Sequence, residues 1–424
     1  MKRVNALALA CLALAALVPA IAANKHLGAA SCASGACHGK QAAETKRNVP
    51  LTEYRTWLKD DSHSRAYSNL RLPASLAIAA KLGIANPATA KICLDCHADN
   101  VPAAERGPKF QLSDGVGCEA CHGGAEKWIE SHAAINSTHK DNLAKGMYPS
   151  ELPQQRATMC LSCHLGTRDA FATHQIMGAG HPRLRFEMET FTSNQPAHYA
   201  KDDDYRKRKG EISGTTLWLT GQFESAKQYL ALLQSPLYPI NGLPEFGLYD
   251  CHSCHTPMAN KSWSVARVGA GLAPGGLRLN RGNLGILGAV AATLGTAADA
   301  QDLTGRVNAL MLAGQKSPAQ VGAAAARVVE WITQRQAWLT RSYGAADASR
   351  LRGALLALGT SDGASDYAIA EQVVMGVDSL SHTIGDDKRV GKALDGLYDA
   401  LADEGAFNPN RFAQAARTAQ AAIK

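Results

Sequence analysis

Cysteine is missing from the last 170 residues of this 424-residue chain, although ten cysteines lie between residues 32 and 254. Aromatic residues make up only 6% of the sequence, and no basic face with interleaved aromatic residues is found, which argues against a nucleic-acid-binding protein. After the N-terminus, no stretch reaches the roughly eighteen consecutive apolar residues that a membrane span needs. The sequence therefore predicts no transmembrane anchor beyond its first segment.

That first segment has the pattern of a secretory signal. Lys2 and Arg3 precede an uninterrupted apolar run, and small residues around Ala22 follow it. This order of charge, apolar stretch and small-residue exit is typical of a cleaved signal peptide. We expect residues 1–23 to be removed and the mature protein to be periplasmic or otherwise exported by a Gram-negative type of signal.

The composition also predicts two regions. Residues 271–285 are rich in glycine and are expected to form a linker. From residue 290 onward the chain is rich in alanine and leucine, with 13 Lys and Arg against 14 Asp and Glu. We expect a cysteine-bearing domain over residues 24–270 and a second domain over residues 286–424.

Four Cys-x-x-Cys-His motifs carry the chemistry of the first region. Two thiols three residues apart can bind the vinyl groups of one porphyrin, and the adjacent histidine can bind its iron as the proximal ligand. The cysteines are Cys93 and Cys96, Cys118 and Cys121, Cys160 and Cys163, and Cys251 and Cys254, and the histidines are His97, His122, His164 and His255.

A fifth motif has a longer spacer. Cys32 and Cys37 are separated by four residues, and His38 follows at once. The spacer contains Ser34 and Gly35, which can bulge outward while the two sulfur atoms keep their separation. We interpret it as a covalent haem site, which makes five haem c groups in all.

Two other uses of these cysteines are open in an exported protein. Zinc sites combine two cysteine pairs but do not require a histidine after each pair. Disulfide bonds are common in oxidising compartments, yet they do not explain the recurring histidine. Five haems in residues 32–255 leave too little chain for separate apolar cores, so we expect the haems themselves to form the core.

Nine histidines remain as candidate second ligands of the irons. His132 and His174 each follow a motif histidine by ten residues, so that a helical stretch would put them roughly 15 Å away from it. Each is therefore expected to reach a neighbouring haem. Gly178, Gly180 and Pro182 prevent a continuous helix between His174 and His181, which lets these two histidines point in different directions.

The region from about residue 27 to 256 resembles the multihaem cytochromes c related to the tetrahaem cytochrome c of ammonia-oxidising bacteria, and more distantly hydroxylamine oxidoreductase. The resemblance lies in the stretches LGAASC…CHGK, DDSHSRAYSNL, GVGCEACHGGAEKWIESH and CLSCHLGTRDAFATHQIMGAGHPRLRFEMETF. It implies that His63 caps the haem of His122 and that His132 caps the haem of His38. It also implies distal roles for His174 and His181.

The sequence leaves several positions open. The resemblance implies that the haem of His97 can lack a distal ligand, although nine histidines are enough to close every site. We include His198 as a further distal ligand. We expect His26 and His139 to be exposed, His252 to face a propionate or solvent, and His382 to lie on an ordinary helix face.

Helical periodicity is clear in the rest of the chain. Residues 215–234 place apolar side chains at helical spacing. Ser317 followed by Pro318 and Gln320 predicts a capped helix start, and Asn408 followed by Pro409 predicts another. The expected fold is mainly α: a haem-cored cytochrome domain with little regular sheet, followed by a bundle of about five helices.

The sequence favours an electron-transfer protein with mostly bis-histidine haems and with redox partner proteins that it does not identify. The alternative is a multihaem oxidoreductase with an open haem that acts on a small nitrogen compound such as nitric oxide, hydroxylamine or nitrite. A homo-oligomer is left open by the sequence, and so is the role of the helical region.

Overall fold

The structure is a computed structural model that describes residues 24–45, 49–238, 243–255, 271–272, 276–361 and 366–423. The described residues are mainly helical, and between them they form two isolated β-bridges and no strand, which confirms the expected mainly-α fold. The predicted signal peptide, residues 1–23, lies outside them. No helix in the described ranges is both long enough and apolar enough to cross a bilayer.

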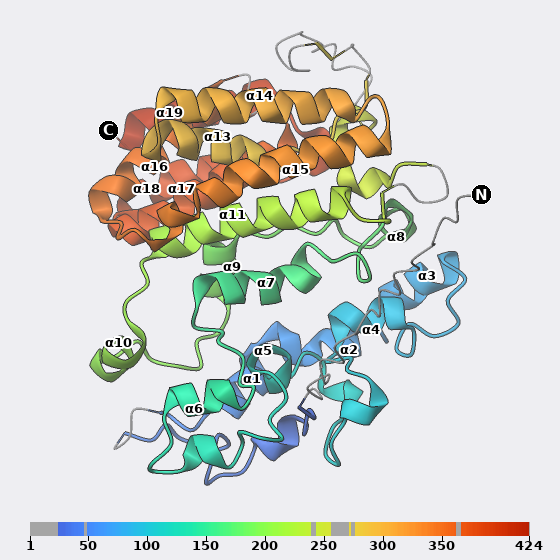
Figure 1. Cartoon of the computed structure of the whole chain (residues 1–424), viewed down its shortest axis with the longest axis vertical. Coiled ribbons are helices and arrows are strands. Elements are labelled where there is room, and N and C mark those ends of the chain that lie inside the picture. The colour runs from blue at the N-terminus through green and yellow to red at the C-terminus, as the bar shows by residue number, and fades with distance from the viewer. Residues whose placement is uncertain are drawn as a thin grey trace, which may run out of the picture.

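The cysteine-bearing region contains short helices joined by long irregular segments (Figure 1). Its α-helices are α1 (Glu53–Asp60), α2 (Ala66–Asn69), α3 (Pro73–Lys81), α4 (Lys91–His97), α5 (Cys118–His122), α6 (His139–Ala144), α7 (Pro153–His164), α8 (His174–Ala179), α9 (Met188–Asn194) and α10 (Asp203–Lys209). Helices this short are marginal in isolation, because few backbone hydrogen bonds offset the cost of nucleation.

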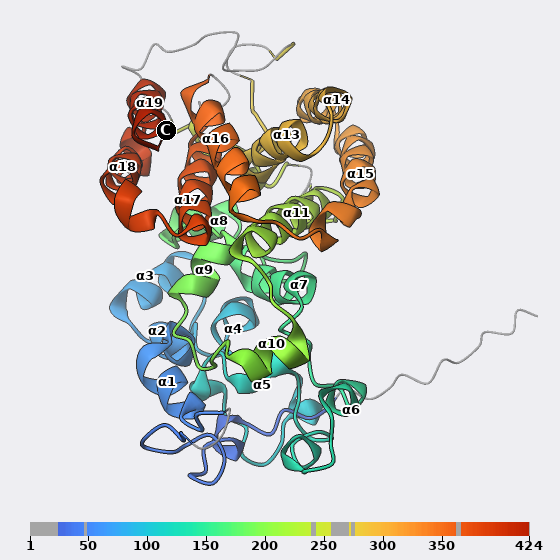
Figure 2. The same ribbon diagram turned by 90° about the vertical axis from the view of Figure 1, so that its left-hand side faces the viewer.

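The second region is a layered bundle of longer helices, which lies above the short helices in Figures 1 and 2. Its helices are α11 (Gly214–Leu233), α13 (Gly282–Leu294), α14 (Ala297–Ala313), α15 (Pro318–Gln334), α16 (Ala345–Thr360), α17 (Tyr367–Ile384), α18 (Asp387–Asp399) and α19 (Pro409–Ile423). The described part of the chain from α13 onward thus has seven α-helices, more than the five expected.

The sequence signals for these helices are confirmed. The predicted helix over residues 215–234 is α11. Ser317 accepts a hydrogen bond from the Gln320 amide at the start of α15, and Asn408 accepts from two amides at the start of α19. Val321, Val328 and Ile332 of α15 are fully buried, as their spacing predicts.

Helix α11 joins the two regions. It packs against α7 and α9 on one side and against α13, α15 and α17 on the other. Its residues Trp218, Leu219 and Phe223 belong to the same apolar core as the C-terminal helices. The bundle therefore begins at α11, before the predicted linker, and α13 begins at Gly282 inside that linker. Residues 256–270, at the predicted end of the first domain, lie outside the described residues.

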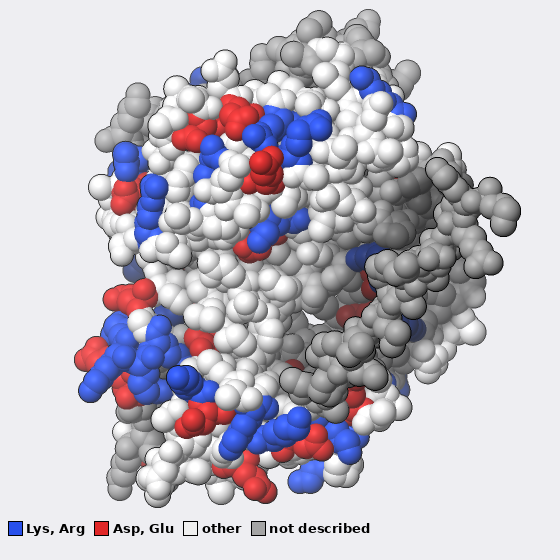
Figure 3. All heavy atoms as spheres, viewed as in Figure 1, with Lys and Arg blue, Asp and Glu red and all other residues white. Residues whose placement is uncertain are grey.

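Charged side chains of both signs are interspersed on the face drawn in Figure 3. The densest cluster lies over α10, which has two aspartates in its first turn and four basic residues in its last. This order of charges suits the helix dipole, because anions stabilise the N-terminal end and cations the C-terminal end.

Candidate haem sites

The five motifs are numbered in chain order as sites 1 to 5, with the motif histidines His38, His97, His122, His164 and His255. Sites 2, 3 and 4 occupy α4, α5 and the end of α7, and site 5 begins in a 3₁₀ turn, Cys251–Ser253. A helical turn puts the two cysteines and the histidine of each motif on neighbouring faces. Three of the α-helices of this region, α4, α5 and α7, thus carry motifs.

Site 1 keeps the backbone hydrogen bond between its histidine and its first cysteine despite the longer spacer. The His38 amide donates to the Cys32 carbonyl, 3.1 Å away, as the His255 amide donates to the Cys251 carbonyl in site 5, 2.8 Å away. A β-carbon at Gly39 would lie 1.9 Å from the Ala33 carbonyl oxygen, so the spacer folds tightly against the residue after the histidine. The two extra residues therefore form a bulge without breaking the link between first cysteine and histidine.

Each motif histidine faces a second histidine. The ring centroids lie 6.1 Å apart for His38 and His132, 6.3 Å for His97 and His181, 6.2 Å for His122 and His198, 6.1 Å for His63 and His164, and 6.2 Å for His174 and His255. The partners of the motif histidines are the five histidines expected from the sequence as distal ligands: His132, His181, His198, His63 and His174.

The spacing within the pairs fits one metal ion between two imidazoles. Two iron–nitrogen bonds of about 2 Å each, with roughly 1.2 Å from each nitrogen to its ring centroid, give about 6.4 Å. A direct hydrogen bond between two imidazole nitrogens about 2.9 Å apart would bring the centroids to about 5.3 Å. The observed 6.1–6.3 Å is too long for that bond and suits an iron atom.

Hydrogen bonds at Nδ1 leave the other nitrogen of several rings available for iron. Nδ1 of His97 lies 3.0 Å from the Ala66 carbonyl, and Nδ1 of His181 lies 2.7 Å from the Pro182 carbonyl. His132 Nδ1 contacts the carbonyl of Ile129 at 2.5 Å. A carbonyl can only accept, so these rings carry their proton on Nδ1 and present Nε2 as the ligand atom.

Two further rings bond to carboxylates. His38 Nδ1 lies 2.9 Å from Glu53, and His63 Nδ1 lies 2.8 Å from Asp61. The bonds to these histidines hold the pKa of both carboxyl groups below the ordinary value, although burial alone would raise it. Both acids are therefore ionised at neutral pH. Sequence reasoning missed both, and only the spacing Asp61-x-His63 offered a signal.

Burial tunes two of the motif histidines toward metal binding. It lowers the pKa of His122 to about 4, and it lowers the pKa of His164 to about 4. Metal ions bind the neutral form of imidazole. Both rings are therefore in the state that an iron requires throughout the neutral pH range. Phe186 and Phe191 flank the His164 ring, each with a centroid 5.3 Å away.

The pairing differs from the expected one at two sites. His132 lies against His38, as the resemblance implied, but His63 lies against His164 and not against His122. His198 takes the place opposite His122. The expected pairing of His63 with His122 is wrong because Asp61 and Gln195, joined by a hydrogen bond of 2.9 Å, bring the His63 segment beside the one that carries His198.

Site 2 was the candidate for an open iron, but His181 stands opposite His97. Helix α8 begins at His174 and ends before Gly180, whose positive φ of 122° turns the chain. His174 and His181 therefore point to different sites, as the sequence predicts. The stretch before His132 is a turn followed by a 3₁₀ helix, Ser131–Ala133, and not the α-helix that its sequence allowed.

Three other histidines have protein partners. The His26 side chain is 14% exposed and bonds to Asp99, which corrects the expectation that it is exposed. His139 Nε2 bonds to Glu151 at 2.5 Å. His382 is 56% exposed on α17, as an ordinary helix-face histidine would be.

The ten motif cysteines are free thiols and form no disulfide. The Cys32 side chain lies beside that of Cys118, and the Cys96 side chain lies beside that of Cys163. Site 1 thus adjoins site 3, and site 2 adjoins site 4. Within the described ranges no group of three or more His, Cys, Asp or Glu side chains could hold a metal ion.

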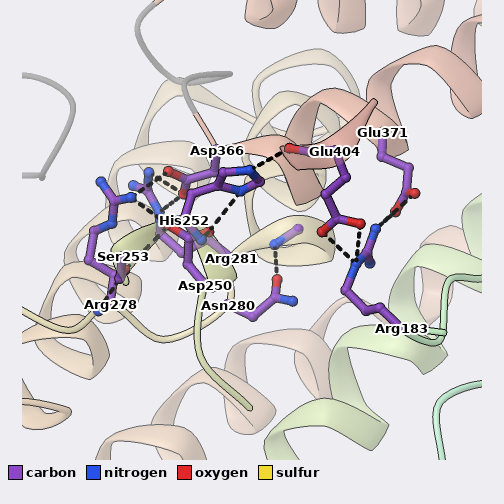
Figure 4. Close-up of polar contacts among 11 residues, drawn as sticks. Arg183, Asp250, His252, Ser253, Arg278, Asn280, Arg281, Asp366, Glu371 and Glu404 are labelled. Atoms are coloured by element: carbon purple, nitrogen blue, oxygen red, sulfur yellow. Dashed lines mark hydrogen bonds and ion pairs between the residues drawn. The ribbon is translucent and has the colours of Figure 1, made fainter. Parts of the chain in front are cut away.

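Site 5 is bound to the helical bundle by a buried polar network, drawn in Figure 4. His252 lies inside the motif, is 12% exposed, and its Nε2 contacts the Glu404 carbonyl at 2.8 Å. Its ring packs on Tyr367 and Phe407, so it faces the bundle and not solvent, which corrects the expectation. Asp250 accepts from the His252 amide and pairs with Arg278.

The same network continues into α17. Arg278 also lies 3.6 Å from Asp366, and Arg281 bonds to the other oxygen of Asp366 at 2.7 Å. Arg183 binds Glu371 and Glu404 at 2.9 and 3.0 Å. Burial and the neighbouring Asp366 raise the pKa of Asp250, and the two acidic partners of Arg183 raise its pKa against the effect of burial. These buried ions are paired, as buried ions must be.

Comparison with known proteins gives a family match for one segment of the chain. Residues 31–123 match the family described as cytochrome c554 and c-prime. The matched segment contains the motifs of sites 1, 2 and 3, including the widened motif. It supports a multihaem c-type cytochrome that functions in electron transfer and holds covalent haem c.

The match covers less than a quarter of the chain, and sites 4 and 5 and the helical bundle lie outside it. No match is found among curated proteins or among solved structures. A relationship to the cytochrome of ammonia-oxidising bacteria in particular remains a prediction.

Proposed function

We propose that this chain is an exported pentahaem c-type cytochrome that transfers electrons between redox partner proteins through five closely packed bis-histidine haems. Each haem, when bound, supplies an iron that cycles between the ferric and ferrous states. The single observation that carries the proposal is the set of five imidazole pairs with centroids 6.1–6.3 Å apart. Every motif histidine has a partner at this distance.

The residues of the chain then have separate tasks. The motif cysteines would tether each porphyrin, and the paired histidines would hold its iron from both sides. The contacts of Cys32 with Cys118 and of Cys96 with Cys163 bring neighbouring sites together. His181 opposite His97 favours electron transfer over the alternative of an enzyme with an open iron at site 2.

The haem count tests the proposal first. The intact mass of the mature protein should correspond to residues from about Ala23 or Asn24 onward plus five haems. Cys37→Ser should weaken or remove attachment at site 1, and loss of both Cys32 and Cys37 should subtract one haem. A wild-type mass with four haems, unchanged by that double substitution, would contradict the role of the widened motif.

The ligand state tests the other half. Electron paramagnetic resonance should show only low-spin ferric iron, and the reduced protein should bind no carbon monoxide. The ring planes predict two classes of low-spin signal, because the planes cross at 88–90° in sites 2, 3 and 4 but at 13° and 33° in sites 1 and 5. Perpendicular ligands leave two iron d orbitals nearly degenerate, whereas parallel ligands split them. A high-spin signal in the wild-type protein would restore the enzyme alternative.

His198→Ala gives a positive control for that measurement. It should convert one of five irons, at site 3, to a high-spin state that binds carbon monoxide. His139→Ala is the matched substitution of a histidine outside the pairs and should leave all five low-spin.

A further inference from the structure

One helix carries an acid at each end, and each acid contacts an axial histidine of a different site. Helix α1 begins at Glu53 and ends at Asp60, and Asp61 follows as its C-cap. Glu53 bonds to His38 of site 1, and Asp61 bonds to His63 of site 4. Eight residues of α-helix span about 12 Å, so a single rigid element fixes both contacts.

Asp61 is held firmly in this role. It is 5% exposed, and its Oδ1 accepts from both the amide and the Nδ1 of His63 at 3.0 and 2.8 Å. Its Oδ2 accepts from Gln195 Nε2 at 2.9 Å. A carboxylate that accepts three N–H bonds keeps its negative charge, and its orientation toward the imidazole is fixed.

Glu53 is held by a strained backbone. Its Oε2 accepts from His38 Nδ1 at 2.9 Å, while its Oε1 accepts from the Leu51 amide at 3.1 Å. Leu51 is buried and has a positive φ of 60°, the one such non-glycine residue in the described part of the chain. A leucine rarely adopts this conformation, and residues with such backbone strain cluster at functional sites.

Site 2 provides the contrast. Both of its histidines bond at Nδ1 to backbone carbonyls, those of Ala66 and Pro182. A neutral carbonyl withdraws the Nδ1 proton less than a carboxylate does. A carboxylate therefore makes the imidazole a stronger donor to iron, and a stronger donor stabilises the ferric state over the ferrous state.

We propose that Glu53 and Asp61 are positioning residues that lower the reduction potentials of sites 1 and 4 relative to site 2. The proposal rests on the proposed function, because it requires iron between the paired histidines. Under this proposal, two residues at the ends of α1 make the reduction potentials of the haems unequal. They act through the axial histidines and do not contact the iron.

The test is a redox titration followed by electron paramagnetic resonance. Asp61→Asn keeps an acceptor for His63 but removes the charge. It should favour reduction at site 4 by about tenfold, which for one electron is about 59 mV upward. Glu53→Gln should do the same at site 1. The ring planes give the class of each signal: site 4 shares the perpendicular class with sites 2 and 3, and site 1 shares the other class with site 5. Asp61→Asn should therefore shift one of the three perpendicular signals, and Glu53→Gln one of the two others.

If Asp61→Asn fails to fold, a second variant tests the same contact with an expected shift of the site 4 potential in the opposite direction. Gln195→Leu removes the donor to Oδ2, so more of the carboxylate charge is directed at His63, and the potential of site 4 should fall. Glu151→Gln is the matched control: Glu151 binds Nε2 of His139, the nitrogen that an iron would need. It removes one charge without touching an axial ligand and should shift the potentials at least about threefold less.

The outcomes separate the two proposals. A shift of a single signal within the class of the altered site, with the other signals of that class constant, supports the inference. Shifts no larger than those of Glu151→Gln, or equal shifts at all sites, overturn it while five haems are still found by mass. Fewer than five haems in the wild-type protein overturns the proposed function instead.

Discussion

The two regions of this chain are built on different kinds of core. Between residues 24 and 213 only fifteen apolar side chains of the described residues are buried, and eight of them are alanines. From α11 onward a single apolar cluster contains fifty-one buried residues, including Trp218, Trp331 and Phe412. A protein-only core of fifteen apolar side chains, eight of them alanines, cannot offset the conformational entropy of nearly two hundred residues.

The difference teaches what each region needs in order to fold. The bundle has its own apolar core, and we therefore expect it to fold without a cofactor. The motif region has short helices around paired imidazoles, so its missing apolar contacts are those that covalent porphyrins would supply. The network of Figure 4, with Arg183, Asp250 and Asp366, joins the two regions.

The largest expected effect comes from withholding haem. Protein exported by cells that lack haem attachment should lose structure throughout residues 24–210 but keep α11 and α13 to α19 folded. Hydrogen exchange measured by peptide should show rapid exchange in the first region and protection in the second. Equal protection in both regions would show that the first region has a sufficient core without haem, and would break the comparison.

The sequence predicted the bundle well because its signals are local. Ser317, Pro318 and Gln320 mark the start of a helix within four residues, and apolar spacing marks its buried face. The division near residue 270 was less accurate, because α11 looks like part of the motif region in sequence and joins the bundle only through long-range packing. No local sequence signal shows whether a helix packs against earlier or later segments of the chain.

The candidate sites were predictable in their chemistry but not in their pairing. Each motif names its own cysteines and histidine, and the five second histidines were also identified. The path of irregular segments decides which second histidine faces which site. The sequence therefore predicted the wrong partner for His63. The sequence gives almost no signal for the roles of Glu53 and Asp61, because a carboxylate near a histidine is common. Only the structure shows that they contact His38 and His63.

A core substitution in the bundle has the next largest effect. Phe412 of α19 is fully buried, and Phe412→Ala should lower the free energy of unfolding of the bundle by about 3–5 kcal/mol, since it removes apolar contact and leaves a cavity. The visible spectrum of the haems should not change. Denaturant unfolding followed by far-ultraviolet circular dichroism measures the loss.

Arg417→Ala, on the exposed side of the same helix, is the control for Phe412→Ala and should stay within about 0.5 kcal/mol of wild type. A change of the haem spectrum in Phe412→Ala at temperatures where the bundle is folded would mean that the two cores are one cooperative unit.

The smallest effect makes the sharpest comparison, because the chain offers the same capping box in both regions. Thr138 begins α6 with Asp141 at the third position, and Thr296 begins α14 with Asp299 there; in each, the threonine hydroxyl accepts from the aspartate amide at 3.2 Å. Removing such a cap costs about 1 kcal/mol of helix stability. Because the two caps are chemically identical, a difference between the effects of removing them reflects how each helix packs against the rest of the protein.

Helix α14 contributes Leu303, Leu310 and Met311 to the bundle core, so it can open only when the bundle opens. Helix α6 has six residues, of which only Asn142 is buried, so it can open alone. Thr296→Ala should therefore lower the global stability of the bundle by about 1 kcal/mol, whereas Thr138→Ala should raise local amide exchange in α6 and leave global unfolding unchanged. If Thr138→Ala instead lowers global stability as much as Thr296→Ala, α6 unfolds together with the rest of its region, and that region is as cooperative as the bundle despite its small apolar core.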